Sequence, residues 1–382
     1  MIKPGIALVS LGALLAAASC ATPPREGPWP RRPADPPLPE PALRHAPPRY
    51  VCGRVDGPIT VDGRLDEPGW AQAAWTADFM DIQGPRQPAP RHRTRAKMLW
   101  DDRCLYIAAD LEEPHLWATL TERDAIVYYD HDFEVFLDPS GSTHHYAEIE
   151  INALNTVWDL MITRPYRDHG RALHGWNIPG LQTAIGLNGT LNDPSDTDAG
   201  WTVEIAIPWE GIKEIDPDLI PPRAGDVWRV NFSRVQWKLD RKDGGYAKAL
   251  DPATGKPWPE DNWTWAPTGL INIHYPERWG LVRFSEHPPG RTILDFEIDS
   301  AEMQARGLLR QVYHRQHAYR HAHGRFARTP SELNLAAPVA PGGTLQLAAA
   351  WDQFQARWIL PDGRTLWNIN ELGRIWKSEA EQ

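Results

Sequence analysis

Alternating polar and apolar residues between positions 128 and 162 constrain the fold of this chain more than any other feature of its sequence. In residues 132–137, and again in residues 146–152, every second side chain is apolar. A period of two is typical of a half-buried β-strand. Residues 138–141, Asp-Pro-Ser-Gly, have the composition of a tight turn, and a third strand is predicted over residues 155–162. The stretch therefore predicts three consecutive strands of one sheet.

The polar positions of these strands carry carboxylates and an amide, with an aromatic residue before and after them: Tyr128, Glu134, Glu148, Glu150, Asn152 and Trp158. Carboxylate and amide oxygens accept hydrogen bonds from hydroxyl groups, and aromatic rings stack on apolar faces. This combination suits a sugar ligand. The alternative is a solvated outer sheet face on which Glu serves solubility.

Further short strands, separated by Gly, Pro and Asp turns, are predicted over residues 51–55, 59–61, 96–100, 105–111, 183–191, 201–207 and 227–237. With little helix between them, they predict a mainly β fold, an antiparallel β-sandwich over residues 49–287. In the last of these strands the apolar phase changes after Phe232, which predicts a β-bulge near Arg234.

The N-terminal residues have the pattern of an export signal. Lys3 precedes a short apolar run, and Ala17-Ala18-Ser19 stands directly before Cys20. This resembles a bacterial lipoprotein signal over residues 1–20, with lipidation at Cys20; the alternative is an ordinary secretory signal. Pro-rich residues 21–48 predict an extended tether. From this signal we expect an exported protein at the outer membrane or periplasmic face. No later apolar run is long enough to span a bilayer, so we expect the lipid to be its membrane anchor.

Charge and cysteine content narrow the possible partners. The formal net charge is −10 and no basic, aromatic-interleaved patch occurs, which argues against nucleic-acid binding. Cys52 and Cys104 are candidates for a disulfide in an oxidising compartment, with two buried thiols as the alternative.

Seven motifs occur in a characteristic order: VDGRLDEPGW, KMLWDDRCLYIAADLEE, DHDFEVFLDP, YAEIEINALNTVWD, GWTVEIAIPW, GDVWRVNFSRV and ERWGLVRF. This order resembles the family 9 carbohydrate-binding modules, which are β-sandwiches of the DOMON-like class. The resemblance covers about two thirds of the chain. It implies a carbohydrate-binding fold more specifically than it implies a particular ligand.

In that family a sugar end lies between two Trp rings, and Glu, Asn, Arg and Gln side chains supply hydrogen bonds. The resemblance carries the Glu to Glu134, the Asn to Asn152 and the first Trp to Tyr128. It places Glu150 where the family has Arg. The second Trp falls near Ile273-His274, and the Gln falls near Ser233-Arg234, so the site is partly rewritten.

Family members also carry structural calcium, for which Asp130, Asp132 and Asp138 are the candidate ligands. Tryptophan is more frequent (19) than Tyr (10) or Phe (8), and Trp263 and Trp265 follow a Gly/Pro-rich loop where stacking platforms are easily placed. The alternative for each is a packed loop anchor. The complete predicted ligand-binding set is Tyr128, Glu134, Glu150, Asn152, Trp158, Arg234, Trp237, Trp263 and Trp265.

Residues 288–382 are predicted to form a small C-terminal α+β unit. Asp299-Ser300 can cap a helix over residues 301–323, and Gly324 suits its C-terminal end. Three strands are predicted over residues 345–350, 356–360 and 365–369. The role of this unit is left open.

The sequence supports three functional hypotheses. The first is a surface-anchored, non-catalytic protein that binds oligo- or polysaccharide and supports polysaccharide degradation. The second is a glycoside hydrolase with paired carboxylates such as Glu134 and Glu150. The third is haem binding, for which Met98, Met161 and His274 are the axial-ligand candidates. No catalytic residue is assigned.

Overall fold

The computed structural model describes residues 47–290, 296–297, 300–335 and 343–380. The predicted signal segment, Cys20 and all but the last two residues of the predicted tether lie outside these residues. None of the helices in the described part of the chain is long and apolar enough to cross a lipid bilayer.

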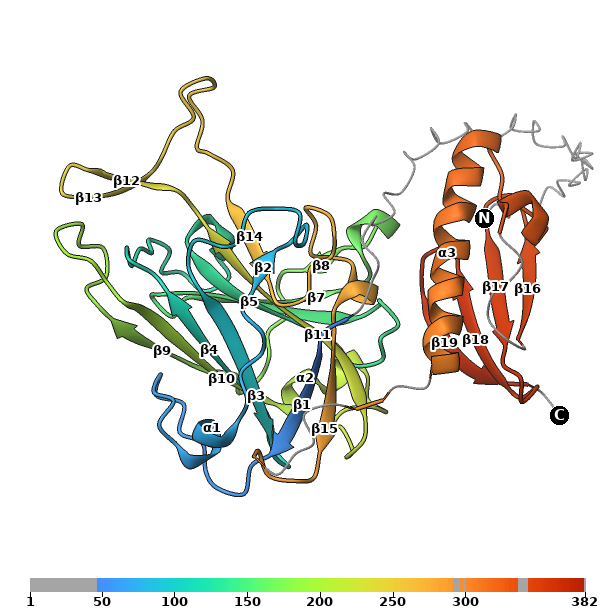
Figure 1. The fold of residues 1–382 in the computed structure, drawn as a ribbon, viewed down its shortest axis with the longest axis horizontal. Coiled ribbons are helices and arrows are strands. Elements are labelled where there is room, and N and C mark those ends of the chain that lie inside the picture. The colour runs from blue at the N-terminus through green and yellow to red at the C-terminus, as the bar shows by residue number, and fades with distance from the viewer. Residues whose placement is uncertain (1–46, 291–295, 298–299, 336–342, 381–382) are drawn as a thin grey trace, which may run out of the picture. The chain divides into compact units, whose positions relative to one another are not determined.

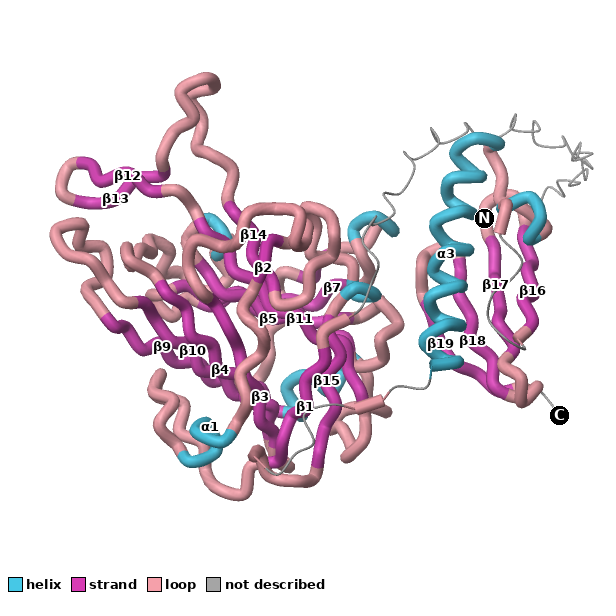
Figure 2. Tube along the Cα trace, in the orientation of Figure 1, coloured by secondary structure: helices cyan, strands magenta, loops and turns pink. Residues whose placement is uncertain are grey.

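Thirteen strands form one strongly curled sheet, and helices are few (Figures 1 and 2). The strands are β1 (Arg49–Arg54), β2 (Met80–Asp81), β3 (Thr94–Trp100), β4 (Cys104–Glu112), β5 (Asp132–Asp138), β6 (Tyr146–Asn152), β7 (Val157–Ile162), β8 (Ala172–Leu173), β9 (Gln182–Asn188), β10 (Gly200–Pro208), β11 (Val227–Gln236), β14 (Asp261–Thr264) and β15 (Gly280–Ser285). Their order is β8-β7-β6-β5-β11-β15-β1-β3-β4-β10-β9, and β14 pairs with β11 and with β2. This region also contains the short helices α1 (Pro68–Gln72) and α2 (Trp209–Ile212) and the hairpin of β12 (Leu239–Lys242) and β13 (Gly245–Lys248). Four single-turn 3₁₀ helices complete it: Val127–Tyr129, Tyr166–Asp168, Lys213–Ile215 and Pro276–Arg278.

The mainly β prediction is confirmed, but the purely antiparallel arrangement is wrong at β1. This strand runs parallel to both of its neighbours, β15 and β3. Antiparallel neighbours can be joined by a tight turn, whereas parallel neighbours need a long connection. Here residues 55–93 supply that connection between β1 and β3, and the predicted strand over residues 59–61 is absent from them.

The two halves of the curled sheet pack face to face around one apolar core. The inward positions of β5 and β6 meet those of β3, β4 and β10 in this core. Phe133, Val135, Ile149 and Ile151 all lie in it, as the period-two pattern predicts. The alternate side chains of β5 and β6 consequently lie on the opposite face of the sheet.

The predicted bulge near Arg234 is also wrong. Pairing is regular through Ser233 opposite Glu134 and Arg234 opposite Trp263. Alternation continues without interruption, so Arg234 follows Phe232 on the core side and Val235 follows Ser233 on the other. The apparent change of phase arises because the core side of this strand holds a charged residue.

The predicted disulfide is wrong, because Cys52 and Cys104 are both free, buried thiols. Cys52 lies in the core between the sheet halves, whereas Cys104 packs with Trp70 and Tyr106 in a separate apolar cluster. Leu105 points into the main core, so its neighbour Cys104 points to the opposite face of the sheet.

Thiol labelling distinguishes two free thiols from a Cys52–Cys104 disulfide. Burial raises the pKa of both Cys52 and Cys104, which disfavours the reactive thiolate. We therefore expect the chain without residues 1–20 to resist iodoacetamide when folded and to take two labels in denaturant without reductant, as read by intact mass. A chain that takes labels only after reduction would contradict the structure.

The described residues after position 300 form a helix and a four-stranded antiparallel sheet. The elements are α3 (Ser300–His323), β16 (Thr344–Ala349), β17 (Phe354–Ile359), β18 (Thr365–Asn370) and β19 (Ile375–Glu379). Their apolar side chains make a cluster of their own, in which Leu309, Val312 and Tyr313 of the helix meet Phe354 and Ile369. The structure adds β19 to the three strands predicted here.

Candidate functional site

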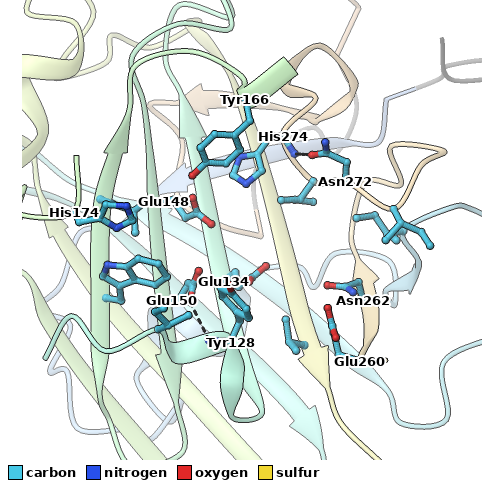
Figure 3. A pocket seen from close by; sticks show the side chains of 17 residues that line it. Tyr128, Glu134, Glu148, Glu150, Tyr166, His174, Glu260, Asn262, Asn272 and His274 are labelled. Atoms are coloured by element: carbon cyan, nitrogen blue, oxygen red, sulfur yellow. Dashed lines mark hydrogen bonds between the residues drawn. The ribbon is translucent and has the colours of Figure 1, made fainter. Parts of the chain in front are cut away.

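A pocket of about 470 Å³ lies on the outer face of β5, β6 and β7, and it is bordered by the segments that precede β5, follow β7 and β8, and flank β14 (Figure 3). Its polar and aromatic lining residues are Tyr128, Glu134, Glu148, Glu150, Trp158, Tyr166, His174, Glu260, Asn262, Asn272 and His274. In Figure 3 the carboxylates of Glu134, Glu148 and Glu150 occupy the centre, and the other labelled side chains surround them.

Strand pairing explains why these side chains converge. A cross-strand row runs from Ser233 to Glu134, then to Glu150 and to Trp158, each directly opposite the next. Directly paired residues in antiparallel strands point to the same face. Glu148 joins the same face two residues before Glu150. The period that buries the Ile side chains of β6 therefore presents its Glu side chains to the pocket.

Aromatic rings form one wall. Trp158 stacks on His174 with a centroid distance of 5.4 Å and an interplanar angle of 12°, and Tyr128 lies 6.4 Å from Trp158. Tyr166 contacts His274 edge-on at 4.6 Å. The Trp158 Nε1–H is buried and has no hydrogen-bond partner among the described residues. Since buried donors are normally paired, this N–H is an unmet hydrogen-bond donor in a side chain that lines the pocket.

Three buried carboxyl groups form the floor. Glu134, Glu148 and Glu150 are 6%, 5% and 2% exposed. Burial raises the pKa of Glu134 to about 7, against an ordinary value of 4.5. Burial, followed by the charge of Glu134, raises the pKa of Glu148 and Glu150 well above their ordinary value. The Tyr128 backbone N–H donates to Glu150 at 3.0 Å.

This floor is acidic and meets no Lys or Arg. The described residues that line the pocket include four Glu and two histidines, His174 and His274. Burial and then Arg167 lower the pKa of His274 to about 3, so that ring is neutral. Ionised carboxylates in such surroundings are costly unless a donor or a cation meets them.

The structure brings together four of the nine predicted ligand-binding residues: Tyr128, Glu134, Glu150 and Trp158 all line the pocket. Their role in binding stays a prediction. Trp237 lies beside the pocket, where its indole N–H donates to the Tyr128 carbonyl at 2.9 Å and Lys248 lies over its ring at 3.3 Å. This hydrogen bond indicates that Trp237 holds the backbone of Tyr128 in place without lining the pocket itself.

Asn152 does not reach the pocket, contrary to the prediction. Its amide N–H₂ donates to the Leu120 carbonyl at 2.9 Å and to Asp130 at 3.0 Å, and its amide oxygen accepts from the backbone of Leu154 and Thr156. All its hydrogen-bonding capacity is therefore used to hold the turn after β6 against a neighbouring loop.

Arg234 also faces away from the pocket. Its guanidinium is fully buried on the core side and pairs with Glu113 at 2.8 Å and with Gln236 at 2.7 Å. Trp263 lies opposite Arg234 in β14, and both Trp263 and Trp265 are only 3% exposed in the main core. The stacking platform predicted at these two residues is wrong, because β14 continues the sheet and directs them inward.

The predicted calcium ligands do not share one site. Asp130 accepts hydrogen bonds from the backbone of Thr119 and Leu120, and Asp138 accepts one from Thr143 N–H at 2.9 Å. These two residues cap turns. Asp132 instead belongs to a different group, with Glu134 and Glu150, whose members each offer an oxygen within 4.8 Å of the others.

Several pocket residues have no signal in the sequence. His174 and Glu260 come from irregular loops and Tyr166 from a single 3₁₀ turn (Tyr166–Asp168), where no periodicity predicts the direction of a side chain. Ile273 and His274 do line the pocket at the position where the family's second Trp falls. The family resemblance was therefore the one feature of the sequence that pointed to residues 273 and 274 as part of the pocket.

Comparison with known proteins extends the resemblance. Residues 61–221 match the model of the carbohydrate family 9 binding domain-like family. Exoglucanase XynX of Acetivibrio thermocellus is 25% identical over 174 residues, which are 45% of this chain and 14% of that enzyme. The chain thus spans about one seventh of the length of this relative.

Solved structures of three chains are similar. A family 9 carbohydrate-binding module of Caldicellulosiruptor kristjanssonii in complex with cellotriose has 14% identity and a TM-score of 0.39, covering 65% of this chain and all of that one. The same kind of module with glucose has 15% identity and a TM-score of 0.40 over 66% and 99%. A putative carbohydrate-binding protein of Bacteroides uniformis has 14% identity and a TM-score of 0.46 over 63% and 100%. The family whose model matches residues 61–221, the carbohydrate family 9 binding domain-like family, is the one that the order of the motifs predicts.

Proposed function

We propose that this chain is an exported carbohydrate-binding protein, anchored to a bacterial membrane through a lipid on Cys20, that supports polysaccharide degradation. The observation that carries the proposal is the pocket itself, where aromatic rings stand beside three buried carboxyl groups. Its volume of about 470 Å³ is within the usual range for small-molecule sites, about 300–1,000 Å³. The family match and the sugar complexes of similar modules support a sugar as the ligand.

Each wall has a distinct part in this proposal. The rings of Tyr128 and Trp158 offer faces to the C–H side of a pyranose ring. Glu134, Glu148 and Glu150 accept hydrogen bonds from its hydroxyl groups. The hydroxyl groups of the sugar and the carboxyl groups of the pocket thus pair with each other, and the C–H side of the sugar is buried against the aromatic rings.

Glycoside hydrolysis is a second candidate, favoured by one observation. Glu134 and Glu150 are directly opposed on neighbouring strands, and burial raises the pKa of both. A carboxyl group that remains protonated near neutral pH is what a general acid requires. Incubation of a bound oligosaccharide with the protein, followed by chromatography of the products, distinguishes an enzyme from a binding protein.

Replacing Trp158 by alanine is expected to weaken glycan binding at least about tenfold, because a well-packed aromatic contact in a binding site contributes about 1.4 kcal/mol or more. A glycan array with the chain lacking residues 1–20 identifies the ligand, and calorimetry then measures its affinity. The matched control is Trp351→Ala, since Trp351 is 56% exposed and lies outside the pocket.

Two results would contradict the proposal. One is silence across the array from a protein with normal circular dichroism. The other is equal affinity of wild type and Trp158→Ala for the ligand that the array finds. A loss of binding in Trp351→Ala alone would place the site elsewhere.

A further inference from the structure

Part of the pocket floor has the geometry of a cation site. Asp132, Glu134 and Glu150 each place one carboxylate oxygen within 4.8 Å of the other two. Oxygen ligands bind Ca²⁺ at about 2.3–2.6 Å, so two ligands on opposite sides of the ion are at most about 5.2 Å apart. Three oxygens that all lie within 4.8 Å of one another can therefore reach one Ca²⁺ ion together.

Asp132 provides the second observation. Its side chain is fully buried, and one oxygen accepts the Val235 backbone N–H at 3.0 Å. The other oxygen, Oδ2, has no hydrogen-bond partner among the described residues. A carboxylate oxygen that is buried and unpaired costs free energy. Since Asp132 belongs to the three-carboxylate group, this oxygen is free to bind an ion held there.

The described pocket lining supplies no permanently charged basic side chain that would serve instead. Lys and Arg are absent from it, and it includes Glu148 and Glu260 in addition to the two Glu of the group. Arg234, on the next strand, points to the opposite face and pairs with Glu113. A carboxylate cluster of this kind is stable when a divalent cation neutralises it.

We propose that Asp132, Glu134 and Glu150 bind one calcium ion in the floor of the pocket and that glycan hydroxyl groups complete its coordination. Glu134 and Glu150 line the pocket, so an ion between them is reached by a ligand in it, while Asp132 holds the ion from behind. Three carboxylates leave several of the six to eight calcium positions for water or hydroxyl oxygen. The hydroxyl part of this inference rests on the proposed function; the ion site does not.

The first test uses Ca²⁺ alone. The chain lacking residues 1–20 is treated with chelator, dialysed and titrated with Ca²⁺ by calorimetry. Wild type is expected to bind one ion per chain, and the double variant Glu134→Gln and Glu150→Gln to bind it about 100-fold more weakly or not at all. Asp132→Asn, which keeps the shape of the side chain, is a second variant in case the double variant folds poorly. Glu260→Gln, an acidic lining residue outside the group, is the control and is expected to retain binding within a few-fold.

The second test measures glycan affinity with Ca²⁺ and with EDTA. A loss of at least about tenfold in EDTA, absent from the double variant, supports a bridging ion. Failure of wild type to bind Ca²⁺, or equal Ca²⁺ binding by the double variant, overturns the ion site. Ca²⁺ binding with unchanged glycan affinity in EDTA overturns the bridging role. Glycan binding without any Ca²⁺ binding leaves the proposed function standing alone, whereas Ca²⁺ binding without any glycan ligand overturns the proposed function and leaves the ion site.

Discussion

Replacing Glu113 by alanine is expected to lower the free energy of unfolding by about 3–5 kcal/mol, because it leaves a buried arginine without its counter-ion. The side chains of Arg234 and Glu113 are 0% and 2% exposed, and their atoms Nη2 and Oε2 lie 2.8 Å apart. Gln236 donates to the same Glu113 oxygen at 2.9 Å. Although burial alone would raise it, the hydrogen bond and charge of His131 and the charge of Arg234 bring the pKa of Glu113 far below its usual value.

Urea unfolding followed by circular dichroism measures this effect. Glu113→Gln keeps the shape and one hydrogen-bond acceptor, so it is expected to be less destabilising than alanine. The control is Glu210→Ala, because the Glu210 side chain is 79% exposed and surface changes usually stay within about 0.5 kcal/mol. A loss below about 1 kcal/mol in Glu113→Ala would show that Arg234 finds solvent or another partner.

Trp265→Ala is expected to destabilise the protein by about 3–5 kcal/mol, the usual cost of removing a buried aromatic side chain. Trp265 packs on Phe232 with a centroid distance of 5.8 Å. It also covers Gly280, where an added Cβ would lie 2.4 Å from the indole ring. The backbone at Gly280 is in close contact with the indole ring, so an alanine at position 265 leaves a cavity beside Gly280.

This variant separates two roles for Trp265. A core residue lost to alanine lowers the urea midpoint, whereas a stacking platform lost to alanine leaves the midpoint unchanged and abolishes glycan binding. We expect the first result. Trp258→Ala is the matched control, since Trp258 precedes β14, the strand that Trp265 directly follows, and is 37% exposed. Equal midpoints for Trp265→Ala and wild type would restore the platform hypothesis.

The sequence by itself determined the three strands β5, β6 and β7 and the polar face of the first two. Because side chains alternate along a strand, Glu134 and Glu150 must lie on one face of the sheet when Phe133 and Ile151 are buried on the other, whatever the rest of the chain does. The acidic floor of the pocket followed from this period and from the pairing of two consecutive strands.

Only the tertiary structure decided which surfaces cover each face. Arg234, Trp265 and Cys104 lie in regular strands or beside them, and local pattern cannot state whether the facing layer is core, pocket or solvent. The short 3₁₀ turn that holds Tyr166 and the loop that holds Glu260 carry no sequence period that predicts their place at the pocket. Side-chain direction within a strand is set by local geometry, whereas burial and partners are set by contacts between residues far apart in the chain.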